Sequence, residues 1–265
     1  MSKIIVLGTG HAMVTEYFNS CFLIEHDQRY LLVDTGGGNG ILAQLKKAQA
    51  DILAIHDVFI THSHFDHMLG LFWIIRSAAY EMRLGTYVGN LNIYITSENA
   101  KLVRDFVLGV YPGMGELLDS RILFVDVFHG MKLELLDSSI TVMDLKPHER
   151  HHFGFRMDYE GKSLSYFGDV PYHDSLHDMV FQSDWLMHEA FCLDSQMDIF
   201  KPHEKNHSTV KDACEVAAML EAKNLVLFHT EDDTIENRRQ LYIDEGRQFF
   251  NGNIFVPDDL DVIEI

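Results

Sequence analysis

The sequence predicts an α/β fold in which sheets are covered by helices. Short β-rich runs alternate with helical patterns along the chain, and no Pro/Gly/Ser-rich or charged linker separates them. With 265 residues, 47% of them hydrophobic, the chain can bury a sizeable core. Only five prolines are scattered through it, which argues against a hinge between domains. We therefore expect one domain over residues 1–265.

Eight apolar runs have the length and the β-branched or aromatic content of strands. In chain order they are Ile4–Leu7, Cys21–Glu25, Tyr30–Asp34, Val58–Thr61, Leu91–Thr96, Ile140–Leu145, Leu164–Phe167 and Leu225–Phe228.

Two stretches, Leu69–Arg83 and Val210–Leu220, have helical spacing. In the second, Val210, Ala213, Cys214, Ala217 and Leu220 line one face. Thr209 and Asp212 are spaced as a capping box, which places the helix start at Val210.

Charge and cysteine content restrict the class of protein. Twenty-one basic and forty acidic residues leave a net charge of −19, which disfavours a broad nucleic-acid or anionic-membrane surface. No apolar run approaches the roughly 18 residues that span a bilayer, and the first apolar run is too short for a signal peptide. Cys21, Cys192 and Cys214 lie far apart, as expected in a reducing cytoplasm. Histidine is in excess, with 16 residues.

Four potential metal ligands lie in the segment Thr61-His62-Ser63-His64-Phe65-Asp66-His67. Residues two apart in an extended segment project to the same side, so His62 and His64 can bind one ion while Asp66 and His67 face a neighbouring position. Imidazole and carboxylate suit zinc, and also iron or manganese. This segment therefore predicts a metal site.

Further metal-ligand residues follow other predicted strands. Asp169 and His229 each come directly after an apolar run, as His62 does, and His148 follows Ile140–Leu145. Polar groups of open α/β sites gather at the carboxyl ends of strands. We expect these residues to complete the metal shells.

These motifs resemble those of metallo-β-lactamase-fold hydrolases, and within that superfamily those of the ribonuclease Z branch. The ligand segment is specific only to the superfamily, whereas His188-Glu189-Ala190 and His207-Ser208-Thr209 are similar to two loops of the branch. Other matching segments are Leu7-Gly8-Thr9-Gly10 with Asn19-Ser20, Leu32-Val33-Asp34-Thr35-Gly36, His148 with Gly154-Phe155-Arg156, Phe167-Gly168-Asp169 and Leu225–His229. The resemblance implies a four-layer αββα sandwich.

The resemblance also implies two divalent metal ions, with a hydroxide held between them that attacks phosphorus. One ion would be bound by His62, His64 and His148, and the other by Asp66, His67 and His229, with Asp169 bridging them. Asp66 would also orient the hydroxide. A homodimer is implied in the same way.

Catalytic and substrate-contacting roles are expected for a few further residues. His207 would donate a proton to the leaving oxygen, and Glu189 would tune the acidity of His207. Arg156, and less strongly Lys201 and Lys205, would contact substrate oxygens, and His203 would lie on a lid. We assign His129, His151, His152, His173 and His177 to the surface or the core.

The sequence also departs from ribonuclease Z. No Gly-rich basic arm is present, Phe191 replaces the threonine that closes the His-Glu-Ala-Thr loop, and Thr230-Glu231-Asp232-Asp233 replaces Ser-x-Arg-Tyr. We therefore favour a phosphodiesterase acting on a small or cyclic phosphodiester or a short RNA 3′ end. A tRNA 3′-end endonuclease, and a metal-binding protein or hydrolase of a non-phosphate ester, are the alternatives.

Overall fold

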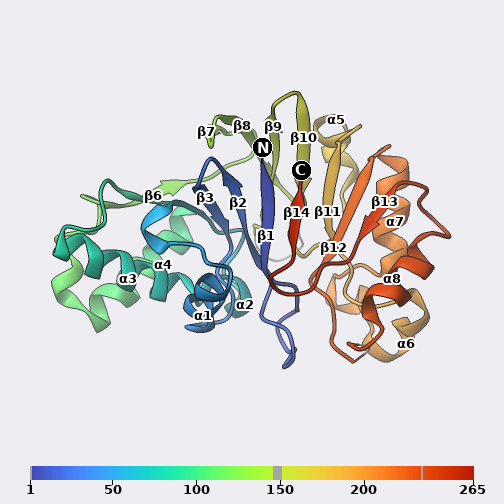
Figure 1. The fold of residues 1–265 in the computed structure, drawn as a ribbon, viewed down its shortest axis with the longest axis horizontal. Helices are drawn as coiled ribbons and strands as arrows, with labels where there is room; N and C mark the ends of the chain where they lie inside the picture. Colours follow the sequence, from blue (N-terminus) through green and yellow to red (C-terminus); the bar gives the residue numbers. More distant parts are fainter. Residues whose placement is uncertain (1, 146–150, 234) are drawn as a thin grey trace. The chain divides into compact units, whose positions relative to one another are not determined.

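The computed structural model describes residues 2–145, 151–233 and 235–265, which form two compact units. The first unit contains the residues up to Gly8, Phe18–Val127 and Asp259–Ile265, and the second contains Thr9–Tyr17 and Phe128–Asp258. Each unit has a seven-stranded sheet flanked by helices (Figure 1). The predicted α/β class is confirmed.

The sheet of the first unit has the strand order β14-β1-β2-β3-β4-β5-β6. Strands β14, β1, β2 and β3 pair in antiparallel fashion, and β3, β4, β5 and β6 are parallel. Their bounds are β1 Lys3–Gly8, β2 Cys21–His26, β3 Arg29–Val33, β4 Ile55–Phe59, β5 Leu91–Ile95, β6 Ile122–Asp126 and β14 Val262–Glu264.

The helices of this unit are α1 (Gly40–Lys47), the single turn α2 (Phe65–Met68), α3 (Leu71–Leu84) and α4 (Ser97–Val110). Helix α3 buries an apolar stripe against the sheet, formed by Leu71, Ile74, Ile75, Ala78, Ala79 and Met82. At about 1.5–3 kcal/mol for each fully buried large side chain, this stripe is a main source of stability. Helix α3 covers most of the predicted helix Leu69–Arg83.

The sheet of the second unit has the order β13-β12-β11-β10-β9-β8-β7. Strands β10, β11, β12 and β13 are parallel, whereas β7, β8, β9 and β10 pair in antiparallel fashion. Their bounds are β7 Lys132–Leu135, β8 Ser138–Asp144, β9 Phe153–Tyr159, β10 Lys162–Tyr166, β11 Trp185–Glu189, β12 Asn224–Phe228 and β13 Asn253–Phe255.

The α-helices in the described part of the second unit are α5 (His177–Val180), α6 (Met197–Phe200), α7 (Val210–Met219) and α8 (Arg238–Gly246). Thr209 and Asp212 form the predicted capping box, and α7 begins at the predicted residue. Its Val210, Ala213, Cys214 and Ala217 are buried against the sheet.

Each of the eight predicted strands overlaps an observed one. The largest shift is at β4, which covers Ile55–Phe59 where the sequence predicted Val58–Thr61. Thr61 instead bonds to Asp34. This shift leaves the residues after Phe59 in the loop that leads to the histidines.

Among the described residues, no helix has the combined length and apolar composition that crossing a lipid bilayer requires.

Candidate metal centre

In the first unit, the carboxyl ends of the parallel strands β3 and β4 carry Asp34 and the pair Thr61-His62. The chain continues through His64, which is the N-cap residue of α2, and Asp66 and His67 lie within that turn. Thr35 holds the turn against the end of β3, because its backbone N–H and its hydroxyl both donate to the His67 carbonyl, each at 2.8 Å.

A close backbone approach fixes the same turn. A side chain at Gly70 would place Cβ 1.9 Å from the Thr35 carbonyl oxygen, so only glycine fits there. The Gly70 N–H donates to the Gly36 carbonyl at 2.9 Å.

Asp34 orients two histidines of this loop, and sequence analysis did not assign it a role. It is fully buried, with its backbone in the left-handed region at φ 56°. Its carboxylate accepts from His67 Nδ1 at 2.8 Å and from the Thr61 hydroxyl at 2.8 Å, and the Thr61 hydroxyl in turn lies 2.9 Å from His62 Nδ1. Protons on both Nδ1 atoms leave the two Nε2 lone pairs to act as metal ligands.

The donor atoms of this group suit a divalent metal ion. His67 Nε2 lies 3.2 Å from Asp66 Oδ2, near the ~3.4 Å that separates two ligands of a tetrahedral ion with ~2.1 Å bonds. The His62 ring lies 4.4 Å from that of His64 and 4.2 Å from that of His67. His62, Asp66 and His67 are buried, which favours a bound cation near the carboxylate.

We predict that Asp34→Asn lowers zinc affinity by about tenfold, the lower end of the range for loss of a carboxylate partner of a ligating histidine. An asparagine in the same place can donate its N–H₂ group to His67 Nδ1. This would favour the tautomer with the proton on Nε2, which cannot bind metal through that atom. Competition with a chromophoric chelator measures the affinity. Asp51→Asn, at an exposed 3₁₀-helix cap, is the matched control. Equal affinities of wild type and Asp34→Asn would show that Asp34 does not set the tautomers.

In the second unit, three polar residues lie at the carboxyl ends of neighbouring parallel strands. Asp169 follows β10, Glu189 ends β11 and His229 follows β12. His229 has a left-handed backbone, at φ 57°, which costs of order 1–3 kcal/mol in a non-glycine residue. Such strain persists where neighbouring contacts enforce it. This arrangement matches the strand-end prediction for Asp169 and His229.

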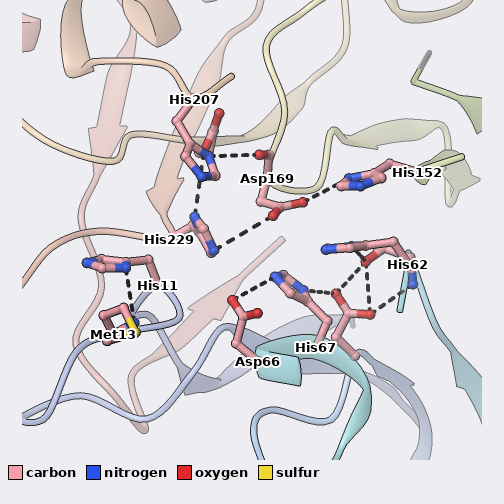
Figure 2. Close-up of polar contacts among 12 residues, drawn as sticks. His11, Met13, His62, Asp66, His67, His152, Asp169, His207 and His229 are labelled. Carbon is pink, nitrogen blue, oxygen red and sulfur yellow. Dashed lines mark hydrogen bonds and ion pairs between the residues drawn. The ribbon is translucent and has the colours of Figure 1, made fainter. Parts of the chain in front are cut away.

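Asp169 lies between two buried histidines. Its Oδ1 is 3.3 Å from His152 Nδ1 and its Oδ2 is 3.9 Å from His229 Nε2 (Figure 2). Ligand-type atoms of Asp169, His207 and His229 also lie within 4.8 Å of one another. A group of imidazoles around one carboxylate has the chemistry of a divalent metal site.

His152 is a residue that sequence analysis assigned to the surface or the core. It is 6% exposed and immediately precedes β9, which runs antiparallel to β10, so the start of β9 lies beside the end of β10. That pairing was the missing signal, since β9 was not among the predicted strands. The predicted ligand His148 lies outside the described residues.

Glu189 connects the predicted proton donor to a predicted ligand. Its Oε2 lies 2.7 Å from His207 Nδ1 and 3.6 Å from His229 Nδ1, and its Oε1 accepts from the Ser208 N–H at 2.9 Å. Burial opposes ionisation of Glu189, but the charges and hydrogen bonds of His207 and His229 outweigh it and lower its pKa. Glu189 is therefore an anion that can stabilise an imidazolium.

The tautomer of His207 follows from its neighbours. Its Nδ1 faces two acceptors, Glu189 Oε2 and the Asp169 carbonyl oxygen at 3.1 Å. Nδ1 therefore carries a hydrogen in both charge states, and Nε2 is the atom that gains and loses a proton. This geometry suits a general acid or base.

The remaining predicted contacts also lie in the second unit. Arg156 donates from Nε to Asp158 at 3.0 Å and from Nη1 to the Met179 carbonyl at 3.1 Å. His203 pairs with Asp212 at 2.7 Å, and the Lys205 ammonium lies 5.2 Å from the centre of the Phe191 ring. The roles expected of these residues stay predictions.

Comparison with known proteins gives the family. The sequence model described as anti-Pycsar protein Apyc1 matches residues 2–250. The chain belongs to the Apyc1 family.

Curated relatives of this Apyc1-family chain include two archaeal proteins named ribonuclease Z. The protein from Thermococcus sibiricus is 25% identical over 100% of this chain and 97% of its own length. The protein from Thermococcus gammatolerans is 26% identical over 99% of this chain and 95% of its own length.

Solved structures share the fold. The metallo-β-lactamase-fold protein YhfI from Bacillus subtilis superposes with a TM-score of 0.81 at 18% identity, covering 100% of this chain and 99% of YhfI. The short form of human tRNase Z gives 0.75 at 22% identity, with 99% of each chain covered. A diphosphatase of the PhnP family gives 0.75 at 19% identity, covering 100% of this chain and 98% of that protein.

The predicted resemblance to metallo-β-lactamase-fold hydrolases and to ribonuclease Z is thus confirmed. The Apyc1-family chain has this fold, and its His/Asp groups indicate that it binds divalent metal.

Proposed function

We propose that this chain is a dinuclear metal-dependent phosphodiesterase of the ribonuclease Z-like type, with one hydrolase domain over residues 1–265. The observation that carries the proposal is that each unit contains a group of buried imidazoles and carboxylates whose histidines are oriented by a further buried carboxylate, Asp34 or Glu189. Each of these carboxylates lies beside Nδ1 of a predicted ligand, His67 or His229, as the carboxylate partner of a metal-ligating histidine does. The full-length similarity to ribonuclease Z adds the reaction class.

At all positions but one, the ligands that we propose for the two ions are those expected from the sequence. His62, His64 and a further histidine, expected from the sequence to be His148, would bind one ion, and Asp66, His67 and His229 the other, with Asp169 bridging. Mixed imidazole and carboxylate donors favour zinc, with manganese or iron as substitutes. When bound, two divalent ions supply Lewis acidity at the phosphoryl group and lower the pKa of a water nucleophile toward about 7.

His152 competes with His148 for the remaining imidazole position, because it lies 3.3 Å from Asp169. We propose His152 as a ligand on this ground. Metal content per chain, measured by plasma emission after dialysis, separates the two. Loss of metal in His152→Ala with retention in His148→Ala supports His152. The reverse result assigns the ligand to His148.

Residues of the second unit would transfer a proton to the leaving group. We propose that protonated His207 gives its Nε2 proton to the leaving oxygen as the P–O bond breaks. Glu189 stabilises the cation beforehand and accepts a hydrogen bond from its Nδ1. Asp66 would orient the attacking hydroxide, and Arg156 stays the predicted substrate contact.

The proposed substrate is a small or cyclic phosphodiester or a short RNA 3′ end. Turnover of bis(p-nitrophenyl) phosphate by the metal-loaded protein tests the reaction class. No turnover despite two bound ions would instead support a narrow RNA substrate or the alternative of a non-phosphate ester.

We predict weak binding of precursor tRNA. A net charge of −19 and the missing basic arm leave no extended surface for counterion release. Filter binding at two salt concentrations measures this affinity. Tight binding that weakens steeply with salt would favour the tRNA 3′-end endonuclease, whose name several relatives carry.

A homodimer in the cytoplasm completes the proposal. Both features stay predictions from the resemblance and from the cysteine pattern.

A further inference from the structure

Phe191 occupies the position where the ribonuclease Z pattern has threonine, and it contacts the proposed general acid. Its ring is stacked on the His207 imidazole, with centroids 4.9 Å apart and an interplanar angle of 19°. The side chain is 4% exposed. The departure from the pattern therefore lies next to a predicted catalytic group.

The backbone of Phe191 is fixed by three hydrogen bonds. Its N–H donates to the Ser208 carbonyl at 2.8 Å, and its carbonyl accepts from the Glu231 N–H at 2.8 Å and from the Tyr242 hydroxyl at 3.3 Å. Ser208 directly follows His207, so the stacked ring and the imidazole are linked through adjacent backbone as well. The ring thus has a defined place.

Further groups gather around the same ring. The His11 ring lies 4.4 Å away, that of Phe200 6.3 Å, that of His229 6.5 Å and the Lys205 ammonium 5.2 Å from the ring centre. These segments are far apart in the sequence. Phe191 is therefore a packing centre between a predicted ligand and the predicted acid.

Hydrogen bonds alone do not fix the His207 ring. Glu189 and the Asp169 carbonyl hold Nδ1, but an imidazole held at one atom can still swing about that point. A flat ring stacked on the imidazole opposes the swing. Aromatic pairs contribute about 0.5–1.5 kcal/mol beyond their buried area, which a threonine cannot supply.

We propose that Phe191 is a positioning residue for His207, which fixes the plane of the imidazole and so the direction of Nε2. This inference rests on the proposed function. In the reaction, hydroxide bonds to phosphorus, the ester P–O bond breaks, and the Nε2 proton goes to the leaving oxygen. His207 then regains a proton from solvent.

The test compares leaving groups. A sugar alkoxide needs a proton as it leaves, whereas p-nitrophenolate does not. We expect Phe191→Leu to lower kcat about two- to thirteenfold, as 0.5–1.5 kcal/mol implies. This loss is expected on thymidylyl-thymidine or 3′,5′-cyclic AMP, whichever the wild type cleaves faster. With bis(p-nitrophenyl) phosphate, kcat should change less than about twofold.

Variants separate positioning from packing. Phe191→Tyr keeps the flat ring and should restore kcat, and Phe200→Leu removes a neighbouring ring that does not contact His207. In the Phe191→Leu/His207→Ala double variant, the Phe191 loss should disappear, because the group that it positions is gone. Equal losses with both leaving groups, or additive losses in the double variant, would overturn the proposal.

A spectroscopic measurement tests the Phe191 proposal independently of the proposed phosphodiesterase function. In metal-free protein, the Phe191 ring current should shift the His207 ring protons upfield, and Phe191→Leu should remove this shift. If wild type cleaves no phosphodiester, the proposed function fails, whatever this shift shows. If wild type is active but Phe191→Leu has full activity on the alkoxide substrate, only the Phe191 inference fails.

Discussion

His229→Ala is expected to lower phosphodiester turnover by about 1,000-fold and to reduce bound metal from two ions to about one per chain. The proposed function makes His229 a ligand of one ion, and a catalytic metal stabilises the transition state by several kcal/mol. The buried Glu189 would also lose the His229 imidazole, whose Nδ1 lies 3.6 Å from its Oε2. Turnover of bis(p-nitrophenyl) phosphate and plasma emission measure the two effects.

His173→Ala is the matched control for this experiment. His173 is exposed and bonds only locally in the described structure, to Ser175, so its loss should leave both metal content and turnover unchanged. A His229→Ala protein with two ions and wild-type turnover would remove His229 from the metal centre. It would also weaken the proposed ligand set as a whole.

His207→Ala is expected to slow cleavage of a sugar-alkoxide diester by about 100-fold while both ions stay bound, as removal of a general acid should. The same change should cost much less with bis(p-nitrophenyl) phosphate, because p-nitrophenolate leaves without a proton. Steady-state kcat on both substrates, with metal analysis of the same samples, measures the outcome.

Two other results would contradict the role of His207. Loss of metal in His207→Ala would make it a ligand, which its place within 4.8 Å of Asp169 and His229 permits. Equal slowing on both substrates would show that it acts on binding or on the nucleophile.

The sequence was sufficient to predict the main features of the candidate site. Apolar runs that end in a polar residue were enough to place Asp169 and His229 at strand ends, because parallel strands of one sheet end at one edge. The capping box before α7 placed His207 just before a helix start, where the structure has it. These signals are local, so they are readable without tertiary contacts.

Features that depend on pairing were not predictable in the same way. Strand β9, Phe-Gly-Phe-Arg-Met-Asp-Tyr, has an apolar residue at every second position that sequence analysis overlooked, but only its pairing with β10 brings His152 to Asp169. Sequence analysis placed Asp34 only at the end of the predicted strand Tyr30–Asp34, and its role comes from Thr61 and His67, roughly thirty residues away. The short strands β13 and β14 have three residues each, below the length at which a pattern is legible.

Neither unit is one continuous stretch of chain. Strand β14, near the carboxyl end of the sequence, pairs with β1, and Asp259 accepts from the Phe18 N–H at 2.7 Å. The second unit in turn takes residues Thr9–Tyr17, where Asp232 accepts from the N–H groups of Thr15 and Glu16. During synthesis on the ribosome, the edge of β1 that does not pair with β2 therefore stays unpaired until β14 has emerged. A fragment cut after Val127 would keep that edge open and expose it to aggregation, so co-expressed halves would be expected to rescue each other better than either folds alone.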